Sequence, residues 1–185
     1  MTDGLEGVIA ASTRLSQVDG EAGQLTLAGY AVEELAPRAS FEEVAYLLLH
    51  GRLPDSAECI EFAHKLAERR ALPHAALELL RELAAVKAPP MDALCMAASV
   101  LGLGHDENPL NDAITAIASF PTVVGVYWRL LNGEKPVPIR LDLSHASRYL
   151  HQLSGAKPPV GRARALETYL NTVSDHGLNA STFAA

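Results

Sequence analysis

Apolar residues recur at three- and four-residue spacing along most of the chain after residue 40. This spacing places them on one face of an α-helix. It predicts helices within residues 40–51, 54–70, 76–86, 91–102, 141–155 and 161–177. The first of these opens with Ser40 and Glu43, which have the spacing of a capping box, and it ends at Gly51. The pattern therefore predicts a mainly α protein.

In several of the predicted helices the apolar residues share one face, as three examples show. The residues that share a face are Cys59, Phe62, Ala63 and Leu66; Leu94, Ala97, Ala98 and Leu101; and Leu166, Tyr169, Leu170 and Val173. Cys59 and Cys95 both lie in apolar helical patterns, so each is predicted to be a buried, inert thiol. They have no CxxC spacing, which argues against a secreted disulfide scaffold and favours a reducing cytoplasm.

Residues 8–30 have a different pattern. Two segments of alternating character flank the turn-rich DGEAG sequence at 19–23, and this arrangement predicts a β-hairpin. The first residues, MTDGLEGVIAAS, lack a basic region followed by a long apolar run, so no signal peptide is indicated.

The stretch from Ala113 to Leu131 is apolar nearly all round. Its length would allow it to span a membrane. Pro121, Arg129 and the scattered Ser and Thr residues instead favour a buried core helix that is bent or broken near Pro121.

Composition and charge narrow the class of protein. The chain has 185 residues, of which 49% are hydrophobic and 20% charged, as expected for one globular domain or a large piece of one. A formal net charge of −7 argues against a nucleic-acid-binding surface.

The segment GLGHDENP contains three residue types that can bind metals. Three such residues in a row, His105, Asp106 and Glu107, cannot all face one ion from a regular element. The simpler interpretation is a loop between two helices, with Asn108 as the N-cap and Pro109 at the first helical position.

The other histidines give no metal-binding pattern. His145 and His151 are six residues apart, so they do not share a helical face. His50, His64 and His74 lie near predicted helix ends or among charged residues, which predicts surface or capping positions. No metal and no cofactor is expected.

The segment SDHGLNAST offers a candidate binding site. Gly177 lets the chain leave the preceding helix, and Asn179 and Ser181 are N-capping types that can begin another. The start of a helix favours an anion, and His176 beside it could donate a hydrogen bond to a carboxylate. The alternative is that His176 caps the finished helix, and the residues alone do not decide between the two.

The segment SDHGLNASTF resembles a segment of citrate synthases, and the likeness is not confined to it. The segments GLEGVIAASTRLSQVDGEAGQLTLAGY, VEELAPRASFEEVAYLLLHGRLP, PPMDALCMAASVLG, FPTVVGVYWRLLNGE and DLSHASRYLHQLSG resemble the family in the same order. The resemblance implies a citrate-synthase-like helical fold with a small N-terminal β-hairpin. Residues 8–30 would form the hairpin region and 40–185 the helical part. The chain 1–185 would be the N-terminal part of the large domain.

The resemblance also implies a reaction and a site. Citrate synthases condense oxaloacetate with acetyl-CoA without a metal, and most are helical dimers. By this resemblance His176 binds oxaloacetate, and Asn179 and Ser181 line the same site. A dianionic keto acid needs cationic or N–H donors, which a histidine supplies.

The sequence also departs from the family pattern. The segments that carry the catalytic histidines and aspartate do not occur in residues 1–185 and are expected in a C-terminal half beyond Ala185. Ala28 and Cys95 stand where the family has arginine, and Val173 stands where it has histidine. The chain alone is therefore expected to be an inactive fragment of a citrate synthase, or of a 2-methylcitrate synthase that uses propionyl-CoA. The alternative is a non-catalytic helical module for dimerisation or regulation.

The same resemblance implies the partners. We expect a homodimer or a complementary C-terminal half, because the helix near Met91 and the stretch 113–131 correspond to family elements that pack across the dimer. Oxaloacetate and acyl-CoA would be the ligands of the complete cytoplasmic enzyme. Neither nucleic acid nor a membrane is expected.

Overall fold

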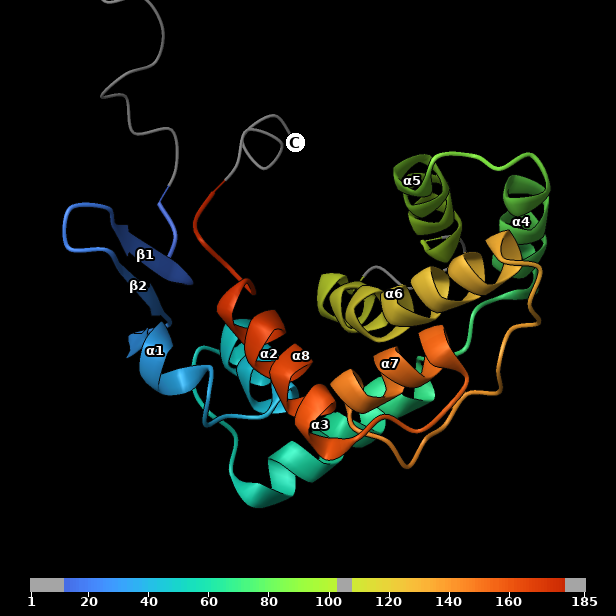
Figure 1. The fold of residues 1–185 in the computed structure, drawn as a ribbon. Coiled ribbons are helices and arrows are strands. Elements are labelled where there is room, and N and C mark those ends of the chain that lie inside the picture. The colour runs from blue at the N-terminus through green and yellow to red at the C-terminus, as the bar shows by residue number, and fades with distance from the viewer. Residues whose placement is uncertain (1–11, 103–107, 179–185) are drawn as a thin grey trace, which may run out of the picture. The chain divides into compact units, whose positions relative to one another are not determined.

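The computed structural model describes residues 12–102 and 108–178. They form a mainly helical structure with one small sheet, as the sequence predicts (Figure 1). The chain divides into two compact units. The first unit contains the described residues of 1–53 and 168–185, and the second unit contains residues 54–167.

The sheet of the first unit has three antiparallel strands in the order β1 (Ser16–Asp19), β2 (Gln24–Leu27) and β3 (Tyr30–Ala31). The β1–β2 hairpin confirms the prediction for this region. Its turn is fixed by Asp19, whose Oδ1 accepts hydrogen bonds from the backbone N–H groups of Glu21 (3.1 Å) and Ala22 (2.9 Å).

Two short helices complete the packing beneath this sheet: α1 (Val32–Leu35) and α2 (Phe41–His50). The predicted capping box is present, since Ser40 N–H donates to Glu43 Oε2 at 2.7 Å and Glu43 N–H donates to Ser40 Oγ at 3.2 Å. Gly51 ends α2 with a φ of 76°, which favours glycine. The core of the unit consists of Leu27, Leu35, Val44 and Leu47.

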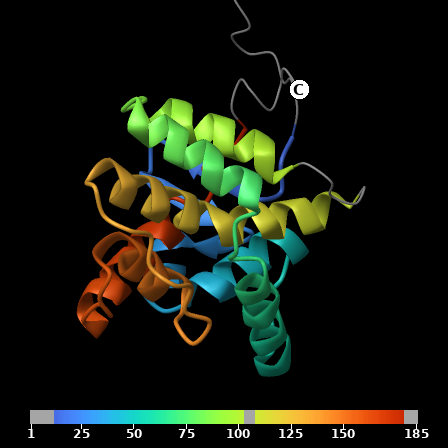
Figure 2. The same ribbon diagram turned by 90° about the vertical axis from the view of Figure 1, so that its right-hand side faces the viewer.

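The second unit is built around α6 (Pro109–Leu131). This helix contacts α3 (Ser56–Glu68), α4 (His74–Ala85), α5 (Pro90–Leu101) and α7 (His145–Ser154). Figures 1 and 2 show α4 and α5 together on one side of α6 and α7 on another. The fully buried members of the core are Ala76, Leu80, Ala93, Ala97 and Val123. The remaining helix, α8 (Val160–Thr172), begins in the second unit and ends in the first.

The structure supports the prediction of a core helix and corrects one detail of it. By length and composition α6 could cross a membrane, but half of its most apolar window is buried inside the protein, as in an ordinary core helix. The helix is continuous through Pro121, so of the two predicted alternatives, bent or broken, the break is not present. Its start confirms the predicted cap, since Asn108 Oδ1 accepts from Leu110 N–H at 3.0 Å and Pro109 follows. The metal-capable residues before Asn108 lie outside the described residues.

The prediction of buried thiols is wrong for both cysteines. Cys95 is exposed and Cys59 only half-buried. The helix α5 buries Ala93, Ala97 and Leu101, which are four residues apart. Cys95 is two positions from Ala93, about 200° further round the helix, so it faces away from the core.

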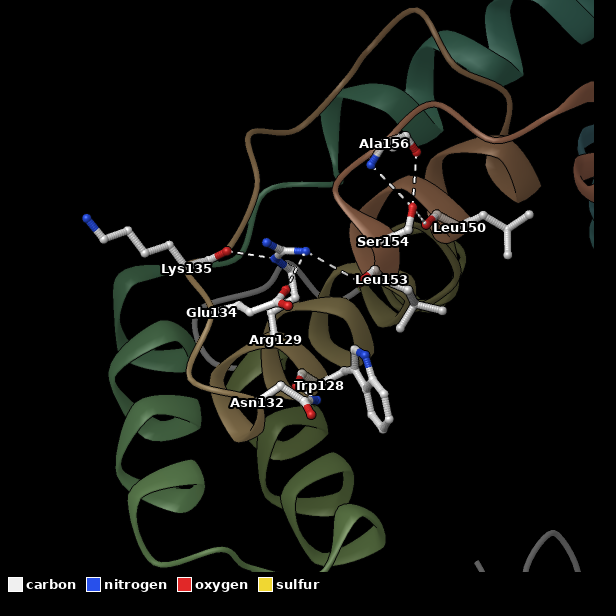
Figure 3. Close-up of polar contacts among 9 residues, drawn as sticks. All are labelled: Trp128, Arg129, Asn132, Glu134, Lys135, Leu150, Leu153, Ser154 and Ala156. Atoms are coloured by element: carbon white, nitrogen blue, oxygen red, sulfur yellow. Dashed lines mark hydrogen bonds and ion pairs between the residues drawn. The ribbon is translucent and has the colours of Figure 1, made fainter.

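The end of α6 is tied to the following loop and to the end of α7 by Arg129 (Figure 3). Its Nε donates to the carbonyl oxygen of Lys135 at 2.7 Å, and Nη1 lies 2.9 Å from Glu134 Oε2. Nη1 also donates to the carbonyl oxygen of Leu153 at 3.5 Å. One guanidinium thus connects three segments of the second unit, while the indole of Trp128 extends away from these contacts.

The close approach of α6 and α7 at Gly125 yields the first prediction. A Cβ atom at Gly125 would lie 2.5 Å from Gln152 Cβ and 3.0 Å from its carbonyl carbon, so Gly125→Ala should force the helices apart. We expect the free energy of unfolding to fall by about 1–3 kcal/mol in chemical denaturation.

The matched control is Gly161→Ala in α8, where an added Cβ would meet nothing within 4 Å. It should be neutral or stabilise by up to about 1 kcal/mol, since alanine is the better helix former. Equal effects of the two substitutions would contradict the close packing.

Candidate functional site

The end of α8 is held by a buried polar side chain. Asn171 is fully buried, and its Nδ2 donates to the carbonyl oxygens of Ala36 (3.3 Å) and Ala39 (3.0 Å). Two members of the predicted apolar face, Tyr169 and Val173, are instead 62% and 49% exposed. The side of the helix that carries Asn171 therefore faces the segment between α1 and α2, because two backbone carbonyl oxygens there need a hydrogen-bond donor.

The turn that follows α8 carries the candidate histidine. Asp175 Oδ1 accepts a hydrogen bond from Gly177 N–H at 3.1 Å and another from the hydroxyl of Ser16 in β1. Gly177 has a φ of 104°, a conformation that other residues rarely adopt. His176 thus lies between two residues whose positions are fixed by one carboxylate oxygen.

His176 is exposed and lies four residues beyond the end of α8. In the last turn of α8, the carbonyl oxygen of Asn171 accepts a hydrogen bond from Ser174 Oγ at 2.9 Å. Ligand binding by His176 stays a prediction. Asn179 and Ser181, the other two predicted site residues, lie outside the described residues.

Ser16, which contacts Asp175, also lines a small polar cavity of about 170 Å³. Its lining residues include Thr13, Arg14, Ser16, Gln17, Thr26 and Ala28. Arg14 supplies the only positive charge among the lining residues. Sequence reasoning did not select Ser16 or Arg14, because the link from β1 to Asp175 joins residues 159 positions apart.

The second unit contains a buried polar cluster that the sequence did not reveal. Arg148 is fully buried; its guanidinium donates to Thr122 Oγ1 and to the carbonyl oxygen of Ala118, both at 2.8 Å. Arg70 is 2% exposed and donates to the carbonyl oxygen of Arg140 at 2.9 Å. These guanidinium groups satisfy backbone and hydroxyl oxygens inside the unit, so the cluster has a structural role.

Two histidines accompany this cluster. His145 is 3% exposed, and burial together with the charges of Arg148 and Arg70 lowers its pKa to about 3. Burial is also the first cause that lowers the pKa of His151. Both imidazoles are therefore neutral at pH 7.

The other histidines occupy the predicted surface positions. His50 and His74 are exposed at the ends of α2 and α4, and His64 is exposed within α3. Within residues 12–102 and 108–178, no group of three or more His, Cys, Asp or Glu side chains could hold a metal ion.

Comparison with known proteins decides the family. The family model described as citrate synthase, C-terminal domain, matches residues 4–185. The chain belongs to the citrate synthase family. Curated relatives include a citrate synthase of Haloferax volcanii, 40% identical over 193 residues that cover 98% of this chain and 51% of the relative. A 2-methylcitrate synthase of Mycobacterium tuberculosis is 36% identical over 190 residues, which cover 98% of this chain and 47% of that relative.

Solved citrate synthase structures share the fold. That from Pyrobaculum aerophilum matches with a TM-score of 0.86 and 35% identity, covering 97% of this chain and 48% of that one. A ternary complex of the Thermoplasma acidophilum citrate synthase with carboxymethyl coenzyme A and oxaloacetate matches with a TM-score of 0.83 and 27% identity, covering 100% and 50%. The chain thus spans about half the length of the citrate synthases it matches.

The exposure of His176 predicts how its removal affects stability. His176→Ala should change the free energy of unfolding by no more than about 0.5 kcal/mol, because an exposed side chain contributes little. Thermal unfolding of the chain measures this. The matched control is Asn171→Ala, which removes the donor to the buried carbonyl oxygen of Ala36 and the part-buried one of Ala39 and should cost about 1–3 kcal/mol. A loss of about 1 kcal/mol or more in His176→Ala would instead identify a helix cap.

The lowered pKa of His145 predicts an acid-sensitive fold. Between pH 6.5 and about 3 the unfolded chain binds a proton at this histidine that the folded chain does not. Stability is therefore fully present above pH 6.5 and decreases as the pH falls through this window. His145→Gln should flatten the dependence of the melting temperature on pH between 7 and 4. The exposed His64→Gln should leave the slope as in the unmodified chain, and equal slopes in both variants would refute the assignment.

Proposed function

We propose that this chain is part of a citrate synthase and that its turn at residues 174–178 contributes to the oxaloacetate site. Membership of the family supports the reaction class. The relative from Thermoplasma acidophilum forms a complex with oxaloacetate and carboxymethyl coenzyme A. The observation that carries the proposal is His176, which is exposed on a turn fixed by hydrogen bonds on both sides.

The chemistry of the ligand suits this residue. Oxaloacetate has two carboxylates and a ketone, and an imidazole N–H can donate to either kind of oxygen. A hydrogen bond to a charged group contributes about 1.5–3 kcal/mol. In this proposal His176 binds and orients the substrate. Proton transfer belongs to groups that residues 1–185 do not include, and no cofactor takes part.

The similarity to a 2-methylcitrate synthase supports a second candidate for the acyl donor, propionyl-CoA. A 2-methylcitrate synthase of Mycobacterium tuberculosis is 36% identical to the chain, close to the 40% of the Haloferax citrate synthase. Propionyl-CoA is therefore the alternative to acetyl-CoA for the same condensation.

The proposal includes a partner for the exposed apolar side chains. Tyr169 and Val173 lie beside the candidate site, and Met91, Met96 and Trp128 are 66%, 46% and 55% exposed in the second unit. Contiguous apolar patches on a protein surface mark interaction sites. A complementary half and a second copy of the chain are the proposed partners. The same surfaces would serve a non-catalytic module for dimerisation or regulation.

A reconstitution experiment tests the proposed function. The chain is joined to the part of the Haloferax volcanii citrate synthase that it does not match. The joined protein should release CoA from acetyl-CoA in the presence of oxaloacetate, whereas the chain alone should give only the background rate. General acid–base catalysis alone contributes about 10²- to 10⁴-fold, so its loss removes measurable turnover.

Two controls define the outcome. His176→Ala in the joined protein should weaken oxaloacetate binding by about 1.5–3 kcal/mol, whereas His64→Ala, on an exposed face of α3, should not. Turnover by the chain alone would disprove the proposal that the groups for proton transfer lie outside residues 1–185. A joined protein that folds but releases no CoA would favour the non-catalytic module.

A further inference from the structure

The turn that carries His176 is held by a residue from the opposite end of the chain. The hydroxyl of Ser16 donates to Asp175 Oδ1, and the same oxygen accepts from Gly177 N–H at 3.1 Å. Two donors on one oxygen restrict the orientation of the carboxylate more than either would alone. The backbone on both sides of His176 is restrained as a result.

Ser16 is itself fixed by the core of the first unit. It pairs with Leu27 across the β1–β2 ladder, and Leu27 is fully buried against Leu35, Val44 and Leu47. The neighbouring backbone bond from Ala28 N–H to the carbonyl oxygen of Leu15 is 2.8 Å long. The hydroxyl therefore belongs to a paired strand of the sheet rather than to a loop.

The residues just before the turn are also held by hydrogen bonds. Asn171 binds the carbonyl oxygens of Ala36 and Ala39, and Ser174 Oγ binds the carbonyl oxygen of Asn171. The contact with Ser16 adds a further restraint at Asp175.

We propose that Ser16 is a positioning residue for oxaloacetate binding: its hydroxyl orients Asp175 and so keeps the His176 turn in one conformation before the substrate arrives. The proposal rests on the proposed function of His176. A preorganised turn lowers the ordering cost of binding, and a polar binding group has to be held within about 0.5 Å of its working position. Ser16 acts through Asp175 and does not touch the substrate.

The test compares three variants of the chain. Ser16→Ala removes the hydroxyl, whereas Ser16→Thr keeps it on a β-branched side chain that suits a strand. Ser99→Ala is the matched control, because the Ser99 hydroxyl donates only within its own helix, to the carbonyl oxygen of Cys95 at 3.2 Å.

The rate of amide hydrogen exchange at Gly177, measured by NMR, reports on the hydrogen bond from Gly177 N–H to Asp175 Oδ1. Ser16→Ala should accelerate exchange at Gly177 by about two- to tenfold, which is the range expected for losing one hydrogen bond. The amides of α2 should keep their rates, and the Thr variant and Ser99→Ala should match the unmodified chain. Unchanged exchange at Gly177 in Ser16→Ala, or equal acceleration throughout the first unit, would overturn the proposal.

Kinetics of the joined protein separate positioning from a general structural role. Ser16→Ala should raise KM for oxaloacetate by about two- to tenfold with kcat nearly unchanged, and Ser16→Thr should restore it. An active joined protein with an unchanged KM would refute positioning and leave the proposed function intact. If the unmodified joined protein is inactive, the proposed function fails, and the proposal for substrate binding fails with it. Exchange at Gly177 then still shows whether Ser16 holds the turn.

Discussion

The hydroxyl of Thr122, in the middle of α6, is the contact on which the polar interior of the second unit depends. It donates to the carbonyl oxygen of Arg70 at 2.9 Å and accepts from the guanidinium of Arg148 at 2.8 Å. It thus connects α6 to the segment that follows α3 and to α7. Because a buried guanidinium is costly unless its N–H groups are hydrogen-bonded, the Thr122 hydroxyl and the Ala118 carbonyl oxygen stabilise Arg148 in this position. Gly125, one turn further on, lets α7 approach closely enough for these hydrogen bonds.

Local signals in the sequence were sufficient to predict most of the elements. Ser40, Glu43 and Gly51 predicted the bounds of α2, and Asn108 with Pro109 predicted the start of α6. Each of these signals acts over three or four residues. The geometry that they encode is therefore independent of the rest of the fold.

Burial and the candidate site depended on contacts that a local pattern does not contain. Several helices have apolar residues on more than one side, so the pattern did not show that Cys95, Tyr169 and Val173 would be exposed. Asn171 is buried against its two acceptors, the carbonyl oxygens of Ala39 and Ala36. These lie 132 and 135 residues earlier in the chain, so no local pattern predicts the contact. His176 was selected by its neighbours and by resemblance, whereas Ser16 required the structure.

The Ser16–Asp175 contact also determines when the candidate site can form. The two residues are 159 positions apart, so every residue between them must be synthesised before they meet. Residues 54–167 form a compact unit of their own and can fold first, since domains generally fold as units during synthesis from the N-terminus. Closing so long a loop costs chain entropy that grows only slowly with length, and a folded intervening unit shortens the loop that remains flexible. The His176 turn is thus one of the last parts of the described structure to form.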